Sequence, residues 1–382
     1  MARHVLVPGL VSAALLLCGC TDGGGQGAET ATATRGRTDA ATGAGTGTDA
    51  GTATRPRTKT QEVAHSGCLV GQAVIGIHQV DLPDGSAEEL LDQADFQAGH
   101  TATLQRGQAG EPLLHTAWLP LGPEPLTVRG YRLDGSGDGL PVDEYSWPGT
   151  ELANRVRALA ASPDGTHFAA LIADGPSVYL EVVDRRTDEV VFSGRDRTDR
   201  TLGLVGDDLL WSQEHGLVYV ADLGAAPADA AGGVVGVALE GLQEDTGQVT
   251  MSLLLGFDEE TWRGGRPQHL ALSADETQLA YAYVPEGTNS HPDITAQVWA
   301  GDLDGTSEPR QVTSGTLSLV GPAFSPDGQH VAVVEYASRG SRNVYVVDAQ
   351  NSTPTEFRGR LDTEAVVVAT DTRVDTLLGW LP

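Results

Sequence analysis

The sequence predicts an all-β fold, and three observations lead to this prediction. Within residues 67–382, β-rich runs alternate with Gly, Pro and Asp turns at spacings of about 8 to 12 residues. Helical periodicity is almost absent from the same stretch. A four-residue turn, Ser-Pro-Asp-Gly, occurs at 162–165 and again at 325–328, each time just before a β-rich run. Its recurrence indicates an internal repeat.

The turn suits a tight connection between antiparallel strands. Proline fixes φ, aspartate can bond the backbone two residues on, and glycine tolerates positive φ. The turn residues with a structural role are Asp164, Gly165, Asp327 and Gly328, and a weaker copy, Ser-Ala-Asp-Glu, contains Asp275. A still weaker copy is Gly206-Asp207-Asp208, placed before a strand at 209–211.

A second repeated pattern, called the repeat register below, follows these strands. It is an apolar strand with an aromatic or polar residue, then two further residues, then Asp at the strand end. It occurs at His78/Asp81, Tyr131/Asp134, Glu181/Asp184, Tyr219/Asp222, Trp299/Asp302 and Tyr345/Asp348. The aspartates are 53, 50, 38, 80 and 46 residues apart. Such periods, with three or four strands each, are typical of β-propeller blades. We therefore predict a six-bladed β-propeller, with seven blades as the alternative if Val234–Phe257 holds another blade within the 80-residue gap.

The Ser-Pro-Asp-Gly turns and the Val-Tyr-Val-Val-Asp strand at 344–348 resemble the WD40-like repeats of TolB-type propellers, which are seen also in actinobacterial lipoproteins such as LpqB. The resemblance spans about 67–382 and implies fold more than function. Residues 68–91 read as the outer strands of one blade, and residues 364–381 as two inner strands without outer ones. We expect them to form a composite N/C-terminal blade that closes the ring and removes its sheet edges.

The N-terminus reads as an export signal. Residues 1–19 begin with Arg3 and His4, continue through an apolar run and end at Gly19, a pattern too short for a membrane span. The junction Leu-Cys-Gly-Cys at 17–20 resembles the lipobox of bacterial lipoproteins, which implies cleavage before Cys20 and a lipid on its thiol. The alternative is an ordinary secreted protein cleaved nearby. Residues 20–66, rich in Gly, Ala and Thr, are expected to be a disordered linker.

Charge and missing motifs exclude several functions. The formal charge is -28, which argues against a nucleic-acid partner and against electrostatic docking to anionic lipids. Lys59 is the only lysine, so Schiff-base and phosphate-loop chemistry would depend on the linker. Neither Gly-x-Ser-x-Gly nor His-Glu-x-x-His is present. We expect no enzymatic activity.

One loop has ligand-like spacing for calcium, at the exit of a predicted strand. Its candidate oxygen ligands are Asp134, Ser136, Asp138, Asp143 and Glu144, and the alternative is a glycine-rich turn without metal. No other cofactor is expected.

His167 and His330 share a repeat position and are expected to be solvated turn residues, whereas the tyrosines and Trp299 of the repeat register are expected in the core. Cys68 is expected to be a buried free thiol.

Two functions of different class remain. The first is a non-catalytic protein-interaction module, a monomeric propeller held at the extracytoplasmic face of the cell membrane by the Cys20 lipid and presented to an envelope protein. The second is a propeller that binds a small ligand or glycan, or less plausibly acts on it, in its central pocket. The segments 268–272 and 318–324, which read as inner strands, are apolar and small, which favours the first.

Overall fold

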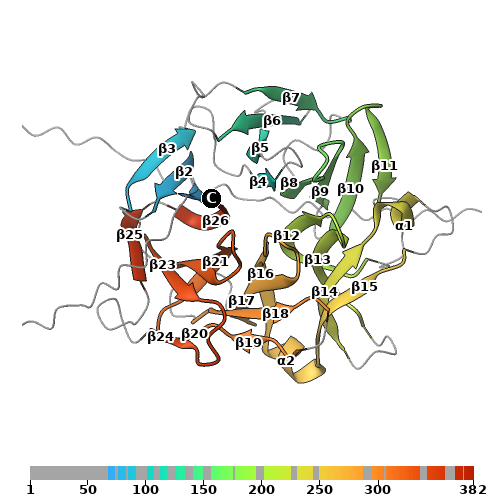
Figure 1. Ribbon diagram of the computed structural model, residues 1–382. Helices are drawn as coiled ribbons and strands as arrows, with labels where there is room; N and C mark the ends of the chain where they lie inside the picture. Colours follow the sequence, from blue (N-terminus) through green and yellow to red (C-terminus); the bar gives the residue numbers. More distant parts are fainter. Residues whose placement is uncertain are drawn as a thin grey trace, which may run out of the picture. The chain divides into compact units, whose positions relative to one another are not determined.

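Six four-stranded antiparallel sheets form a ring, which confirms the six-bladed β-propeller (Figure 1). The computed structural model describes residues 68–73, 76–82, 85–91, 101–106, 112–118, 126–133, 141–148, 156–174, 177–194, 202–224, 230–243, 249–286, 295–304, 307–335, 342–357, 366–372 and 374–382. The chain divides into two units, Met1–Thr58 and Lys59–Pro382, and every described residue lies in the second. The predicted signal peptide, Cys20 and nearly all of the linker fall in the first, outside the described residues.

The first three blades, from the inner strand outward, have the following strands. Blade 1 is β26 (Val374–Leu381), β1 (Cys68–Ala73), β2 (Gly76–Asp81) and β3 (Ala87–Leu91). Blade 2 is β4 (Thr101–Arg106), β5 (Pro112–Trp118), β6 (Thr127–Arg132) and β7 (Asp143–Ser146). Blade 3 is β8 (Val156–Ala161), β9 (His167–Asp174), β10 (Ser177–Asp184) and β11 (Glu189–Ser193).

The other three blades follow the same order. Blade 4 is β12 (Leu204–Ser212), β13 (Gly216–Asp222), β14 (Gly232–Val237) and β15 (Ser252–Phe257). Blade 5 is β16 (Gly265–Leu272), β17 (Gln278–Pro285), β18 (Gln297–Asp302) and β19 (Arg310–Gln311). Blade 6 is β21 (Leu319–Phe324), β22 (His330–Glu335), β23 (Arg342–Asp348) and β25 (Val366–Thr372). Around the ring, each inner strand contacts the inner strands of both neighbouring blades.

One helix lies within blade 4, and a second helix and a small parallel sheet lie between neighbouring blades. Helix α1 (Leu239–Gln243) connects β14 to β15, and α2 (Glu259–Gly264) leads from blade 4 into blade 5. The α2 N-terminus is capped by Asp258, whose carboxylate accepts the Thr261 N–H at 2.7 Å. Strands β20 (Thr313–Gly315) and β24 (Thr355–Phe357) pair in parallel between blades 5 and 6. Among the described residues, neither helix has the length and apolar character needed to cross a bilayer.

The composite closing blade is confirmed, but its strand count differs from the expectation. Strand β26 alone supplies the inner strand, and it pairs with β1 from Cys68 opposite Leu381 to Ala73 opposite Val374. Strand β25, which we expected beside it, instead pairs with β23 as the outer strand of blade 6. Since blade 6 otherwise contains only three strands, β25 is needed there to complete its sheet. The ring is therefore closed by one C-terminal strand on three N-terminal ones.

Two sequence assignments in blade 4 were wrong by one strand. Tyr219 and Asp222 lie on β13, the second strand of its sheet, whereas the register copies in other blades lie on the third. Gly206-Asp207-Asp208 lies inside β12, and the turn that follows is 212–216. This displacement produces the short gap of 38 residues and the long one of 80. Residues 234–257 complete blade 4 with β14, α1 and β15, so the seventh blade does not exist.

Middle strands are buried on both faces because a blade packs between two neighbours. All six residues of β14 are buried, as are five of the six in β22. The repeat-register aromatics follow this rule, since Tyr131, Tyr219 and Tyr345 are buried while Trp299 is half-buried. The core is thus formed by the packed faces of neighbouring sheets, which suits valine-rich strands. The polar residues at the axis and in the turns are attached to these packed strands.

Candidate functional site

A hollow lies on the propeller axis. It is a cavity of about 500 Å³, lined by inner strands of five blades, β26, β4, β8, β12 and β16, together with Gln72 of β1. This volume lies within the range of small-molecule pockets. The charged and amide side chains that line it are Gln72, Arg157, Asp207, Asp208, Gln268 and His269.

Irregular pairing on three adjacent inner strands coincides with these polar side chains. The register of β8 on β9 shifts between Val156 and Ala158, at Arg157. The register of β12 on β13 shifts between Leu204 and Leu209, which spans both aspartates. That of β16 on β17 shifts at His269 and its neighbour. A β-bulge re-aims side chains and interrupts the ladder, so polar groups can face the axis without breaking the blade.

Asp208 and His269 form the electrostatic centre of the cavity wall. Burial raises the pKa of Asp208, and the charge of Asp207 acts in the same direction. His269 and backbone hydrogen bonds from the N–H groups of His269 and Leu270 oppose the rise without cancelling it. His269 adopts φ of 54°, a left-handed conformation that costs free energy for a residue with a β-carbon. Strain and a perturbed carboxylate at one cavity are features that binding sites often share.

The repeat turns form a second polar region, on the face where the first and second strands of each blade connect. In blades 3, 5 and 6 the turn serine donates to the turn aspartate, at 2.7 Å for Ser162 and Asp164, 2.6 Å for Ser273 and Asp275, and 2.6 Å for Ser325 and Asp327. Each aspartate also accepts the backbone N–H two residues on, from Thr166 at 3.0 Å, Thr277 at 3.2 Å and Gln329 at 3.0 Å. The fourth turn position is left-handed in all three, with φ of 69° at Gly165, 56° at Glu276 and 70° at Gly328.

These hydrogen bonds keep the turn carboxylates ionised. The serine hydroxyl and backbone donors hold the pKa of Asp275 and Asp327 below the usual range. At Asp164, partial burial acts to raise the pKa, but hydrogen bonds from Ser162 and Thr166 outweigh it and the pKa is lowered. The turns therefore carry fixed negative charge at neutral pH.

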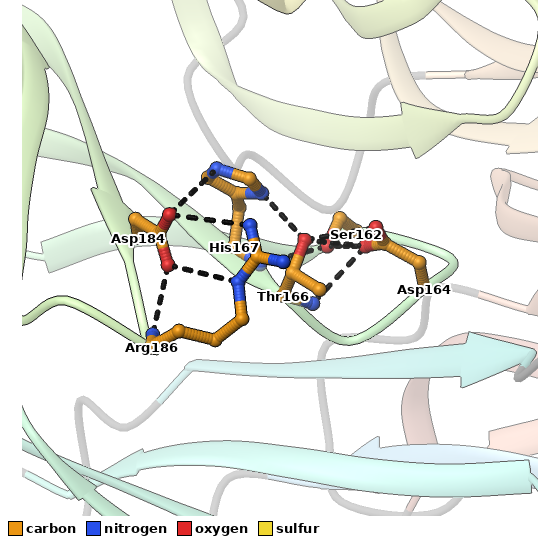
Figure 2. A network of polar contacts seen from close by, with 6 residues as sticks. All are labelled: Ser162, Asp164, Thr166, His167, Asp184 and Arg186. Carbon is orange, nitrogen blue, oxygen red and sulfur yellow. Dashed lines mark hydrogen bonds and ion pairs between the residues drawn. The ribbon is translucent and has the colours of Figure 1, made fainter.

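In blade 3 this turn contacts a Thr-His-Asp arrangement, shown in Figure 2. Thr166 Oγ1 and His167 Nδ1 are hydrogen-bonded at 2.7 Å, and His167 Nε2 lies 3.8 Å from Asp184 Oδ2. The Thr166 hydroxyl also donates to Asp164, at 2.8 Å. Arg186 flanks Asp184, whose pKa is lowered by the backbone and side-chain hydrogen bonds from that arginine.

The arrangement belongs to the repeat. The first residue of the second strand faces the strand-end aspartate in three blades, as His167 with Asp184, Gln278 with Asp302 and His330 with Asp348. Glutamine can replace histidine at this position, so proton transfer is not what the position requires. The contacts hold one turn of a blade to the next turn on the same face. The expectation that His167 is a solvated turn residue is wrong, because it is buried and its ring lies 6.0 Å from that of Trp211.

The predicted site residues are placed only in part. Asp134, Ser136 and Asp138 of the calcium loop lie outside the described residues. Asp143 pairs with Arg185, and Glu144 accepts from Arg129 at 3.1 Å, so both carboxylates face a cation. Across the described parts of the chain there is no group of three or more His, Cys, Asp or Glu side chains able to hold a metal ion.

Among the described residues Cys68 is a free thiol, and it is half-buried where we expected it to be buried. Burial raises its pKa, and the neighbouring Asp81 adds to the rise. Cys20, with which it could form a disulfide, lies outside the described residues.

Sequence reasoning missed the cavity residues. The prediction that segment 268–272 is apolar and small overlooks Gln268 and His269, which line the cavity. Asp207 and Asp208, which the repeat pattern places in a turn, belong to β12. A usable signal was present, because adjacent charged residues inside an otherwise apolar inner strand are expected only where the strand faces water or a ligand.

Comparisons with known proteins support the fold. No protein-family model and no curated protein matched the sequence. The structure is similar to TolB from Acinetobacter baumannii, with a TM-score of 0.52 and 13% identity over 82% of this chain and 66% of that one. It is also similar to a chain of a nidogen/laminin complex, with a TM-score of 0.49 and 12% identity over 82% of this chain and 97% of that one. A third similar structure is the Cps50 (Swd1) β-propeller domain of Myceliophteria thermophila, with a TM-score of 0.44 and 15% identity over 76% of this chain and 98% of that one. This chain thus spans just under two thirds of the length of the TolB chain, and at such low identity the similarity shows a TolB-like propeller fold and nothing finer.

Proposed function

We propose that this chain is a lipid-anchored, extracytoplasmic propeller that acts as a non-catalytic protein-interaction module in the cell envelope. The lipid on Cys20 would hold it to the membrane, residues 20–66 would tether it, and the monomeric propeller would present its faces to a partner protein. This role requires no cofactor and no nucleic acid.

One observation carries this proposal. The described arrangement that most resembles a reactive centre, Thr166 with His167 and Asp184, recurs in two other blades with another side chain in the histidine or the threonine position. Its hydrogen bonds build the turn face, and the threonine hydroxyl is already engaged by Asp164. A rigid face of this kind, whose polar groups are engaged in holding the turns, favours binding over chemistry.

In-cell crosslinking of the tagged full-length protein, followed by mass spectrometry of what co-purifies from the membrane, tests the proposal. We expect one dominant envelope protein, with crosslinks confined to one face of the propeller. A Cys20→Ala variant should lose both membrane fractionation and the crosslinks. Background proteins alone, or an unchanged pattern for the variant, would contradict the proposal.

The central cavity supports a second candidate function, the binding of a small polar ligand. Its specific observation is the convergence of Arg157, Asp207 and His269 on one hollow of about 500 Å³. A thermal-shift screen with amino acids, polyamines and short saccharides tests it, with Asp207→Asn as the site variant and Glu260→Gln on α2 as the matched control. A compound that stabilises the wild type and the control but not Asp207→Asn would support this function. Absence of any such compound would favour the interaction module alone.

A further inference from the structure

A groove lies between blades 3 and 4 on the turn face, with a lining distinct from that of the central cavity. It has a volume of about 320 Å³ and is lined by Pro163, Asp164, Trp211, Glu214, Leu239 and Glu240. That volume is at the small end of ligand pockets and suits one or two side chains. The network in Figure 2 includes Asp164 and His167, which form its blade 3 wall.

At the groove, the blade 4 turn departs from the repeat. Residues 212–216 lack the Pro-Asp-Gly sequence, and the missing turn carboxylate is replaced from outside the blade. Glu276 of blade 5 accepts the Ser212 hydroxyl at 2.6 Å and the N–H groups of Gln213 and Glu214, each at 3.0 Å. Helix α1 begins shortly after β14 and forms the third side. The groove is therefore held on three sides by ordered backbone.

The groove is negatively charged. Its lining contains three carboxylates and neither lysine nor arginine. Asp164 is kept ionised by the turn hydrogen bonds described above. Glu214 and Glu240 are exposed, and Glu276 faces the turn, so the two exposed glutamates are free to meet a partner. The chain charge of -28 adds long-range attraction for a cationic segment.

An aromatic wall complements the carboxylates. Trp211 is half-buried in the groove, beside His167, with the two ring planes inclined by 36°. Pro163 and Leu239 add apolar surface on either side. A guanidinium can stack on an indole while its edge pairs with carboxylates, and an ammonium can also bind the ring face. This combination selects a cation over a neutral or anionic side chain.

We propose that this groove binds an extended segment of the partner protein through an arginine or lysine side chain flanked by small apolar residues. The inference rests on the proposed interaction function and names the chemistry of the partner at one surface. Charge complementarity commits the groove to a basic segment, and its small volume commits it to a short one.

The test uses a photo-crosslinking amino acid at Gln213, an exposed position in the groove, in the full-length protein in cells. The same amino acid at Glu308, an exposed position after β18, serves as the control position. The crosslinked peptide is then sequenced. We expect capture at Gln213 and not at Glu308, with Arg or Lys in the crosslinked peptide. A crosslinked peptide without a basic residue would overturn the inference.

Charge reversal provides the matched comparison. Glu214→Arg with Glu240→Arg should reduce the crosslink yield at Gln213 at least tenfold. Glu260→Arg with Glu308→Arg changes the net charge equally at exposed positions elsewhere and should leave the yield unchanged. Equal losses in both variants would show that the general field of the protein acts, and would overturn the groove assignment. Replacing the basic residue of the partner by glutamate should restore the crosslink yield at Gln213 in the Glu214→Arg/Glu240→Arg variant and in no other variant.

The outcomes separate this inference from the proposed function. If a partner crosslinks efficiently at other positions of the propeller but never at Gln213, the interaction function stands and the groove assignment fails. If no position captures a partner, both fail. Unchanged melting temperatures of the charge variants would show that a lost crosslink reflects lost binding and not unfolding.

Discussion

Glu276 allows backbone strain and an interblade contact to be separated experimentally. It occupies the turn position at which blades 3 and 6 have glycine, with φ of 56°. Its carboxylate accepts three hydrogen bonds from the blade 4 turn. Alanine at this position keeps the left-handed backbone and removes the contact. Glycine removes both the contact and the strain.

The magnitudes follow from these two effects. Three hydrogen bonds at a partly exposed site contribute about 2 kcal/mol in total, because water replaces some of them when the carboxylate is removed. A β-carbon in the left-handed region costs about 1 kcal/mol. Glu276→Ala should therefore lower the free energy of unfolding by about 2 kcal/mol, and Glu276→Gly by about 1 kcal/mol. Gly328→Ala should cost about 1 kcal/mol as pure strain, since a β-carbon there meets no atom within 4 Å.

Equilibrium urea unfolding, followed by tryptophan fluorescence, measures all three variants against the wild type. The gap between Glu276→Ala and Glu276→Gly should match the cost of Gly328→Ala, because both report the same backbone strain. Equal destabilisation by the two Glu276 variants, or a neutral Gly328→Ala, would refute the strain argument. A Glu276→Ala protein as stable as the wild type would refute the contact.

Three further predictions concern closure, acid and calcium. Deleting residues 374–382 should abolish the cooperative thermal transition, because it removes the inner strand of blade 1; a truncated chain that melts like the intact one would contradict this closure. Burial lowers the pKa of His115 to about 4, so the folded protein keeps this ring neutral at pH values where the unfolded chain protonates it. The free energy of unfolding should therefore be unaffected by His115 above about pH 6.5 and should fall by about 3 kcal/mol towards pH 4. In urea unfolding, a His115→Gln variant should show a flatter dependence of stability on pH over this range. Since Asp143 and Glu144 already face arginines, the melting temperature should be the same in EDTA and in millimolar calcium, and a rise with calcium would favour the metal loop.

The turns were predictable because their chemistry is local. Ser, Pro, Asp and Gly in consecutive positions specify a tight turn, and the structure places all of the contacts of Ser325 with Asp327 and His330 within five residues. The same reasoning found the weaker copy at Asp275, where alanine and glutamate replace the proline and the glycine. Strand positions in blades 3, 5 and 6 follow from these turns, since each turn sets where the next strand begins.

Assignments that depended on distant partners were less successful. Strand β25 has an apolar sequence that fits either neighbouring blade, and only pairing with β23 decides between them. The blade 4 turn lacks its own carboxylate and is completed by Glu276, 64 residues from Ser212. Neither outcome can be read from a window of local sequence, because both depend on which edge or donor is left unpaired once other blades have formed.

The sequence by itself determined the all-β class, the propeller repeat and the turn chemistry, because backbone propensity and side-chain period act over a few residues, whereas the choice between six and seven blades needed the strand pairing of blade 4. Tertiary structure decided which terminal strand closes the ring, where the inner strands carry Arg157, Asp207 and His269 to the axis, and where a groove opens between blades 3 and 4. These features arise when curved sheets pack around a common axis, so that residues far apart in the chain share one surface. A local sequence pattern cannot show which of these distant residues will lie side by side, because that depends on how the blades pack in the closed ring.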